Sequence, residues 1–127
     1  MDYLLYIHVF IWYAVGDKRL SAKAKELVES QHQRLISIAS LWEMAIKVNI
    51  GRLEFKEPFD KTISHQFQVN NYSILNLELP HLFKLSRLEL HHRDPFDRVI
   101  ITQAIVEELP IVSADEAFDQ YAITRIW

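Results

Sequence analysis

The chain has 127 residues, half of them hydrophobic, so it fits a single domain (1–127) with one sizeable core. Fourteen basic and 17 acidic side chains give a net charge of −3, whereas proteins that grip duplex nucleic acid through their overall field are usually basic. Nucleic-acid binding would therefore need a local basic patch or a partner. The absence of cysteine excludes disulfides, thiolate zinc sites and a cysteine nucleophile, and is compatible with a cytoplasmic protein.

The apolar opening of the chain does not have the pattern of a membrane segment. It carries Asp2 in place of a basic leader, and its apolar run ends at Val15, short of the roughly 18 residues that span a bilayer. The pattern instead predicts a strand over residues 2–6, buried on both faces, and then a buried helix from His8 to Val15. No membrane partner is expected.

The next elements are marked by capping residues. Ser21 is suited to cap a helix with one apolar side, and residues 35–39 read as a second strand. Ser40 and Glu43 have the spacing of a capping box, which predicts a helix that begins at Ser40. Gly51 suits the left-handed position after its last turn.

Proline marks the start of each remaining helix, since its fixed backbone angle suits the first turn. The three positions are Pro58, Pro80 and Pro95. Asp94 has the right position and side chain to cap the helix that Pro95 opens. Further strands are expected over residues 72–77, 109–113 and 123–127.

Strands that alternate with helices predict an α/β fold, with a central parallel sheet of four to five strands between two helical layers. In such sheets the functional crevice lies beyond the carboxyl ends of the strands. Four segments follow predicted strands closely or open the helix beside them: 6–7, 40–43, 94–97 and 113–115.

Three of those segments carry an acid: Glu43, Asp97 and Asp115. Carboxylates gathered from separate strands repel one another unless a cation or a shared proton neutralises them. Mg²⁺ prefers oxygen ligands and keeps several waters, and a bound metal can activate water against a phosphate. Together the three acids favour a metal site.

Each acid also has a local interpretation. Glu43 could serve only the capping box or pair with Lys47 one turn later. Asp97 could be a first-turn acid favoured by the helix dipole, and Asp115 could cap a short helix at 116–118. The sequence leaves these alternatives open.

The basic cluster His91-His92-Arg93 is not a convincing zinc site, because neighbouring histidines rarely face one ion and no further His or Cys completes a ligand set. A basic loop that borders a phosphate site fits better, against the simpler alternative of a solvated loop. The RNA-binding candidates are Lys47, Arg52, Arg93 and Arg98. No phosphate-binding loop, dinucleotide fingerprint or nucleophile-elbow serine is present, and the tryptophans and tyrosines read as core residues.

Four segments, in this order, resemble a bacterial branch of the PIN-domain family that includes the VapC-type toxins. They are LLYIHVFIW (4–12), SIASLWEMAIK (37–47), HHRDPFDR (91–98) and SADEAF (113–118). The resemblance implies a three-layer α/β/α fold and an endoribonuclease that depends on Mg²⁺ or Mn²⁺. It also implies an RNA substrate, a VapB-type antitoxin, a homodimer and a cytoplasmic location.

On the family pattern, Glu43, Asp97 and Asp115 match the second, third and fourth acidic positions, and they would act as catalytic residues and metal ligands. Ser113 matches a small hydroxyl residue near the metal. The first acidic position is degenerate, because Tyr6 stands where the family has Asp. A phenol with an ordinary pKa of about 10 is neutral near pH 7, and its ring is larger than a carboxylate.

Neither nearby acid replaces the missing one. Asp2 lies roughly 13 Å toward the other end of the strand, and Asp94 is expected to be occupied as a helix cap. Three carboxylates can still hold Mg²⁺ weakly, but the loss of one such group commonly costs about a hundredfold in rate.

Three hypotheses follow for the role of Tyr6. The first is a weakened ribonuclease, and the alternative is a catalytically inactive PIN fold that acts as an antitoxin- or RNA-binding module. The third is that Tyr6 arose by selection against a toxic nuclease during cloning, since one base change converts an Asp codon into a Tyr codon.

Overall fold

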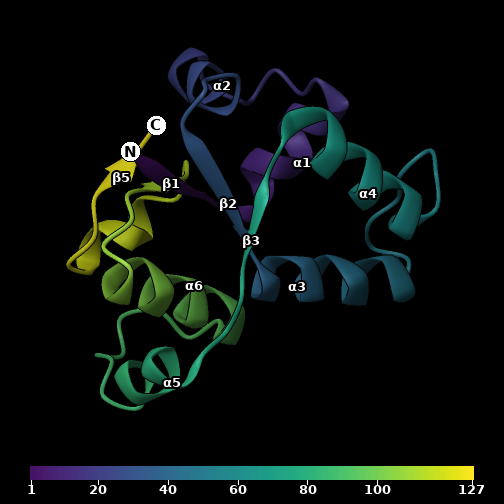
Figure 1. Cartoon of the computed structure of the whole chain (residues 1–127). Helices are drawn as coiled ribbons and strands as arrows, with labels where there is room; N and C mark the ends of the chain where they lie inside the picture. The colour runs from purple at the N-terminus through teal and green to yellow at the C-terminus, as the bar shows by residue number, and fades with distance from the viewer.

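The computed structural model describes all residues from Met1 to Trp127 and contains five strands and six α-helices (Figure 1). In chain order the elements are β1 (Asp2–Leu5), α1 (Ile7–Val15), α2 (Ala22–Val28), β2 (Gln33–Ser37), α3 (Ile38–Asn49), α4 (Phe59–Asn70), β3 (Ser73–Leu75), α5 (Leu79–Leu85), α6 (Pro95–Val106), β4 (Ile111–Val112), the 3₁₀ helix η1 (Glu116–Gln120) and β5 (Arg125–Ile126). None of these helices has the length and apolar composition needed to cross a membrane.

The five strands form one parallel sheet in the order β3-β2-β1-β4-β5. The central strand β1 pairs with β2 on one side and β4 on the other, so that Leu4 lies opposite both Leu35 and Ile111. The chain therefore builds one half of the sheet before it crosses to the other half. This reversal occurs beside β1, which makes the carboxyl ends of β1 and β4 the expected place for a functional crevice.

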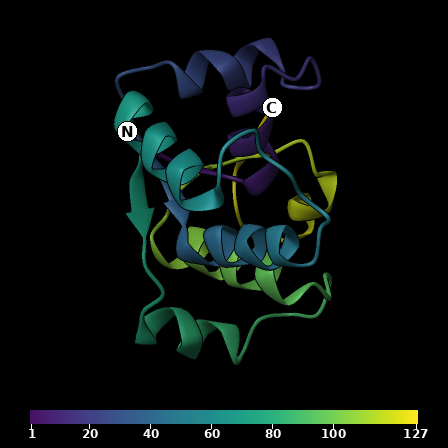
Figure 2. The same cartoon turned by 90° about the vertical axis from the view of Figure 1, so that its right-hand side faces the viewer.

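Alternate residues of β1 enter two separate cores. Tyr3 and Leu5 join the core under α1, α2 and α4, whereas Leu4 joins the core under α6 and η1. The α5 helix packs on the outside of α6, and α3 runs beside α6 (Figures 1 and 2). The predicted three-layer α/β/α architecture with a parallel sheet is confirmed.

The start of α3 differs from the prediction. Ser37, not Ser40, is the N-cap, since its hydroxyl accepts a hydrogen bond from the Ala39 amide at 3.1 Å. Strand β2 ends earlier than expected, so a serine oxygen is already available where the helix begins. The predicted capping box is wrong: Ser40 and Glu43 both lie inside the helix and are buried.

The start of α6 agrees with the prediction. Asp94 is its N-cap and accepts hydrogen bonds from the amides of Phe96 and Asp97 at 2.9 and 3.0 Å. Pro95 occupies the first helical position. Gly51 follows the end of α3 with a φ of 76°, a left-handed conformation that glycine adopts without strain. The start of α6 and the end of α3 are therefore both set by local residues.

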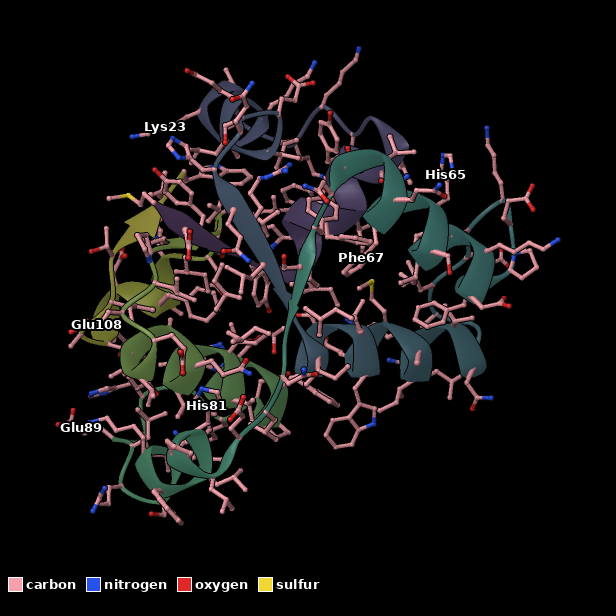
Figure 3. All side chains as sticks on the ribbon, viewed as in Figure 1. Lys23, His65, Phe67, His81, Glu89 and Glu108 are labelled. Atoms are coloured by element: carbon pink, nitrogen blue, oxygen red, sulfur yellow. The ribbon has the colours of Figure 1, made fainter.

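A buried histidine fixes α5 against α6, as Figure 3 shows. His81 accepts a hydrogen bond from the Glu78 amide at its Nδ1 atom, which leaves Nε2 to donate to Glu107 at 2.8 Å. Arg98 of α6 donates to the carbonyls of residues 88, 89 and 92. These contacts hold the loop that joins α5 to α6 and brings His92 to the site.

Candidate active site

The acidic residues converge at the carboxyl edge of the sheet. Tyr6 directly follows β1, and Asp115 follows β4 after two residues. Glu43 lies in the second turn of α3, and Asp97 lies in the first turn of α6. Because α3 and α6 run side by side, the structure brings Glu43 and Asp97 together beside the ends of β1 and β4.

Asp97 occupies the centre of the site and is only 5% exposed. Its Oδ1 atom accepts a hydrogen bond from the Tyr6 hydroxyl at 2.5 Å, and its Oδ2 atom lies 3.1 Å from His92 Nε2. The Asp94 amide donates to His92 Nδ1 at 3.3 Å, so Nε2 carries the proton of the neutral ring. One carboxylate oxygen of Asp97 therefore has a hydrogen-bond donor, and the other has the His92 ring within ion-pair distance.

The environment of Asp97 weakens its acidity. Burial raises the pKa of its carboxyl from 3.8 to about 6, and the nearby charges of Asp94 and Glu43 act in the same direction. The hydrogen bond from Tyr6 and the proximity of His92 oppose this rise but do not cancel it. Such a carboxyl is near its titration range at neutral pH.

Tyr6 fills the position directly after β1. Its ring contacts His8 and Phe118 edge to face, with centroids 4.7 and 5.1 Å away, and it packs against both cores. Burial and the adjacent Asp97 raise the pKa of the Tyr6 phenol well above its usual value of 10. The residue is therefore a neutral hydrogen-bond donor to Asp97, and it cannot offer the negative charge of a carboxylate.

Glu43 has one satisfied oxygen and one that lacks a partner. Its Oε2 atom forms an ion pair with Lys47 Nζ at 2.9 Å, so the predicted pairing one turn apart is present. Its Oε1 atom is buried and has no hydrogen-bond partner. Carboxylate oxygens of Glu43, Asp94 and Asp97 lie within 4.8 Å of one another. A buried oxygen without a partner is unfavourable unless a proton, a water or a cation meets it.

Asp115 has a local role and also faces the site. Its Oδ1 atom accepts a hydrogen bond from the Ala117 amide, so it caps η1 as its local interpretation proposed. Its Oδ2 atom lies 3.9 Å from His92 Nε2. Ser113 is fully buried, and its hydroxyl accepts a hydrogen bond from the Asp115 amide at 3.0 Å. Ser113 therefore orients the loop that carries Asp115.

A second histidine fixes the same loop from α1. His8 Nε2 accepts a hydrogen bond from the Ala114 amide at 3.0 Å, and its ring stacks on Trp12 with centroids 4.6 Å apart. Burial lowers the pKa of His8 to about 4, since the nearby charge of Asp115 only partly opposes it. His8 is thus neutral near pH 7 and acts as an acceptor.

The donor atoms form two groups that share Asp97. One consists of Glu43, Asp94 and Asp97, and the other of His92, Asp97 and Asp115. Glu43 and Asp115 do not belong to the same group. The oxygen-rich first group and the unpartnered Glu43 oxygen fit a divalent cation, which takes one or two protein carboxylates and completes its shell with water.

His92 is the site residue that the sequence analysis missed. The two adjacent histidines were considered only as ligands of one shared zinc ion. In the structure they have different partners, since His91 pairs with the exposed Glu89 at 2.7 Å. The usable signal was the position of His92, two residues before the N-cap of α6. A loop residue just before a helix can lie close to an acid in the first turn of that helix. Here His92 lies beside Asp97.

The four basic candidates have different surroundings. Lys47 pairs with Glu43, and Arg98 donates to three loop carbonyls. Arg52 is exposed and lies beyond the end of α3, just after the left-handed Gly51. Arg93 is exposed and forms no ion pair. The expectation that Trp42 is a core residue is wrong, since its side chain is 61% exposed at the edge of the site.

Comparison with known proteins gives a family and a fold. The family model described as "PIN domain" matches residues 8–123. No curated protein matches the sequence. Among solved structures, a chain of VapBC2 from Rickettsia felis, bound to a DNA fragment from its promoter, has a TM-score of 0.74 and 15% identity. The match covers 99% of this chain and 98% of that one. The chain therefore belongs to the PIN domain family.

Proposed function

We propose that this chain is a VapC-type toxin, an endoribonuclease that depends on Mg²⁺ or Mn²⁺ and whose catalysis is weakened at Tyr6. One observation carries the proposal: the buried Glu43 Oε1 atom lacks a hydrogen-bond partner in a side chain whose carboxylate lies within 4.8 Å of those of Asp94 and Asp97. A divalent cation is the simplest partner for such an oxygen. Membership of the PIN family supports the same chemistry.

Glu43 and Asp97 would hold the cation, with Asp115 contributing from the second group of donor atoms that shares Asp97. The cation would supply positive charge for the phosphate and water of lowered pKa. Within the chain, Lys47 fixes the orientation of Glu43, and Ser113 fixes the loop of Asp115. Water would add to phosphorus while the bond to the 3′ oxygen breaks. The products would carry a 5′-phosphate and a 3′-hydroxyl.

Tyr6 weakens this site in three ways. Its neutral phenol adds no charge to hold a cation, and its hydroxyl already occupies one lone pair of Asp97 Oδ1. Its ring also fills space between His8 and Phe118 at the end of β1. The site therefore retains its peripheral acids but has lost charge at its centre.

A second candidate function is a catalytically inactive PIN fold that binds antitoxin or RNA. It is favoured by the surroundings of Asp97, because Tyr6 donates to one of its oxygens and the His92 ring lies 3.1 Å from the other without any cation. Calorimetric titration with Mn²⁺ separates the two candidates. Micromolar affinity that Glu43→Gln abolishes supports the nuclease, and the absence of binding supports the inactive fold.

The partners of the proposed toxin are a VapB-type antitoxin and a second copy of the chain. The similar Rickettsia felis chain comes from a VapBC complex, which supports the first partner. Three apolar side chains of α5 are exposed by 41 to 63%, and such a patch suits a protein interface. They are Leu79, Leu82 and Phe83. A cytoplasmic location is part of the same proposal.

The activity is tested by incubating the purified protein with RNA and Mg²⁺ or Mn²⁺, and by analysing the cleaved ends. We expect slow cleavage that leaves 5′-phosphates and that Asp97→Asn abolishes. Cleavage that persists unchanged in Asp97→Asn would show a contaminating nuclease and would contradict the proposal.

A further inference from the structure

A groove of about 760 Å³ lies directly beside the acidic site. Its wall includes Trp42, Arg93 and Phe96, each of which is the sequence neighbour of a residue in the site. Trp42 precedes Glu43, Phe96 precedes Asp97, and Arg93 lies between His92 and Asp94. The groove and the site are therefore built from the same turns of α3 and α6.

Trp42 offers a large exposed aromatic surface on this wall. The indole is 61% exposed, although it lies on a helix whose neighbouring residues Glu43 and Met44 are buried. It is also held in place, because its ring meets Phe96 edge to face with centroids 4.9 Å apart and an interplanar angle of 81°. A fixed and exposed indole can stack on a flat ligand with little loss of side-chain entropy.

The charge of the groove is positive. Its only charged lining residues are Arg93 and Arg98, and the other residues are apolar. Arg98 is engaged with the carbonyls of residues 88, 89 and 92. Arg93 is exposed and forms no ion pair, so its guanidinium can bind a phosphate.

We propose that this groove binds one nucleotide of single-stranded RNA next to the phosphate that is cleaved, with the base on Trp42 and a phosphate on Arg93. The proposal rests on the proposed nuclease function and adds a substrate subsite to it. An aromatic surface combined with arginine and no acid is the pattern that binds single strands through stacking and phosphate contacts. A purely apolar partner would leave Arg93 unused.

Trp42 is tested with a short, fluorescein-labelled, single-stranded RNA of mixed sequence, in EDTA so that binding is measured without cleavage. We expect Trp42→Ala to weaken binding by roughly 5- to 150-fold, the range for loss of one base–aromatic stack, and Trp42→Phe to weaken it less. Ile46→Ala is the matched control, since Ile46 is the next exposed apolar residue one turn along α3 and does not line the groove. It should bind like the natural chain.

Arg93 is tested through the dependence of RNA affinity on salt. A phosphate contact to single-stranded nucleic acid contributes about 0.7 to the slope of log K against log salt. We expect Arg93→Gln to reduce the slope by about that amount and Arg93→Lys to restore it. Arg19→Gln, a change of the same kind at an arginine that pairs with Asp17 in the loop after α1, should leave the slope unchanged.

Stacking has its own signature, because a base that covers the Trp42 indole quenches its fluorescence. We expect RNA to quench tryptophan emission in the natural chain and in Ile46→Ala, but much less in Trp42→Ala. If RNA binds equally to the Trp42 and Ile46 variants, the groove proposal is overturned while the nuclease proposal stands.

Two further outcomes also decide the question. If Trp42→Ala leaves RNA affinity intact but abolishes self-association or the binding of an antitoxin peptide, the groove is a protein interface and the proposal is overturned. If the natural chain binds no RNA, the groove proposal is overturned, and cleavage by Tyr6→Asp then tests the nuclease function separately.

Discussion

The two groups of donor atoms that share Asp97 are satisfied in opposite ways. On one side, Tyr6 donates to one Asp97 oxygen, the His92 ring lies 3.1 Å from the other, and Asp115 is occupied as the cap of η1. On the other side, Glu43 keeps a buried oxygen with no partner. One half of the site is complete without an ion, and the other half is not.

This difference shows what replacing a carboxylate with a phenol does to such a site. A carboxylate at position 6 would increase the repulsion around Asp97, and a cation would be needed to offset it. Tyr6 removes that charge and donates a hydrogen bond instead, so the centre is stable as it stands. The repulsion between Glu43 and its acidic neighbours persists only at the edge that Tyr6 does not reach. The following predictions test this contrast.

The largest effect is expected from Tyr6→Asp. Restoring the carboxylate returns charge to the centre of the site, and we expect RNA cleavage in Mg²⁺ or Mn²⁺ to rise about a hundredfold or more. The same change should stop bacterial growth when the variant is expressed without an antitoxin. Cleavage rates of the purified variant provide the direct measurement.

Tyr6→Phe is the matched control for this change. It removes the hydroxyl that donates to Asp97 but keeps the ring between His8 and Phe118, so cleavage should not rise. Tyr6→Asp should also unfold more easily in EDTA, because it loses that packing and adds a charge beside Asp97. Equal cleavage by both variants would mean that the hydroxyl that donates to Asp97, and not the missing charge, limits the site.

A second prediction concerns the side with the unpartnered oxygen. A cation at a hundred times its Kd stabilises the folded chain by about 2.7 kcal/mol, and we expect Glu43→Gln to lose most of this gain. In EDTA the variant should be at least as stable as the natural chain, since glutamine brings no charge near Asp94 and Asp97. Thermal unfolding with and without Mn²⁺ measures both effects.

The control for Glu43→Gln is Glu26→Gln, the same change at an exposed position of α2. It should respond to Mn²⁺ like the natural chain. If the Glu43 variant keeps the full stabilisation, Mn²⁺ binds elsewhere and the proposed role of Glu43 fails.

A third prediction compares the adjacent histidines. His92→Asn should remove the imidazole that lies 3.1 Å from Asp97 Oδ2 and lower the free energy of unfolding by about 1–3 kcal/mol, the usual penalty for a buried group left without its partner. His91→Asn should change it by less than about 1 kcal/mol, since its pair with Glu89 is exposed. Chemical denaturation of both variants in EDTA makes the comparison. Equal losses would show that His92 does not hold Asp97.

The sequence predicted the architecture well, because periodicity and caps are local signals. Asp94 and Pro95 set the start of α6 as expected, and alternating elements implied the parallel sheet. The start of α3 was misplaced because two serines three residues apart, Ser37 and Ser40, both suit a cap. The choice depends on tertiary contacts, since Ser37 also donates to the buried Gln103 of α6.

The site was only partly predictable. The topology rule predicted that Glu43, Asp97 and Asp115 lie at the carboxyl edge of the sheet. In the structure, Asp97 shares one group of donor atoms with Glu43 and the other with Asp115. The hydrogen bond from Tyr6 to Asp97 spans 91 positions in sequence, and no local pattern encodes it. The exposure of Trp42 likewise depends on how the other elements pack around α3, which the local sequence does not encode.

The last prediction concerns pH in the absence of metal. Burial raises the pKa of Asp97 from 3.8 to about 6, so its protonation contributes stability that is fully present below pH 3.8 and is lost as the pH rises through 6. Burial lowers the pKa of His8 from 6.5 to about 4, so the neutral ring contributes stability that is present above pH 6.5 and is lost as the pH falls through 4. The two groups therefore oppose each other between pH 4 and 6.

Single variants should expose each contribution. When the pH falls from 6 to 4, the free energy of unfolding should fall more steeply in Asp97→Asn than in the natural chain, because only His8 remains. It should fall less steeply in His8→Gln, whose amide oxygen can still accept from Ala114. Each difference is limited to about 1.4 kcal/mol per pH unit, the slope for one proton. Denaturation curves in EDTA across this range measure the slopes, and identical slopes would mean that Asp97 and His8 do not titrate as their burial requires.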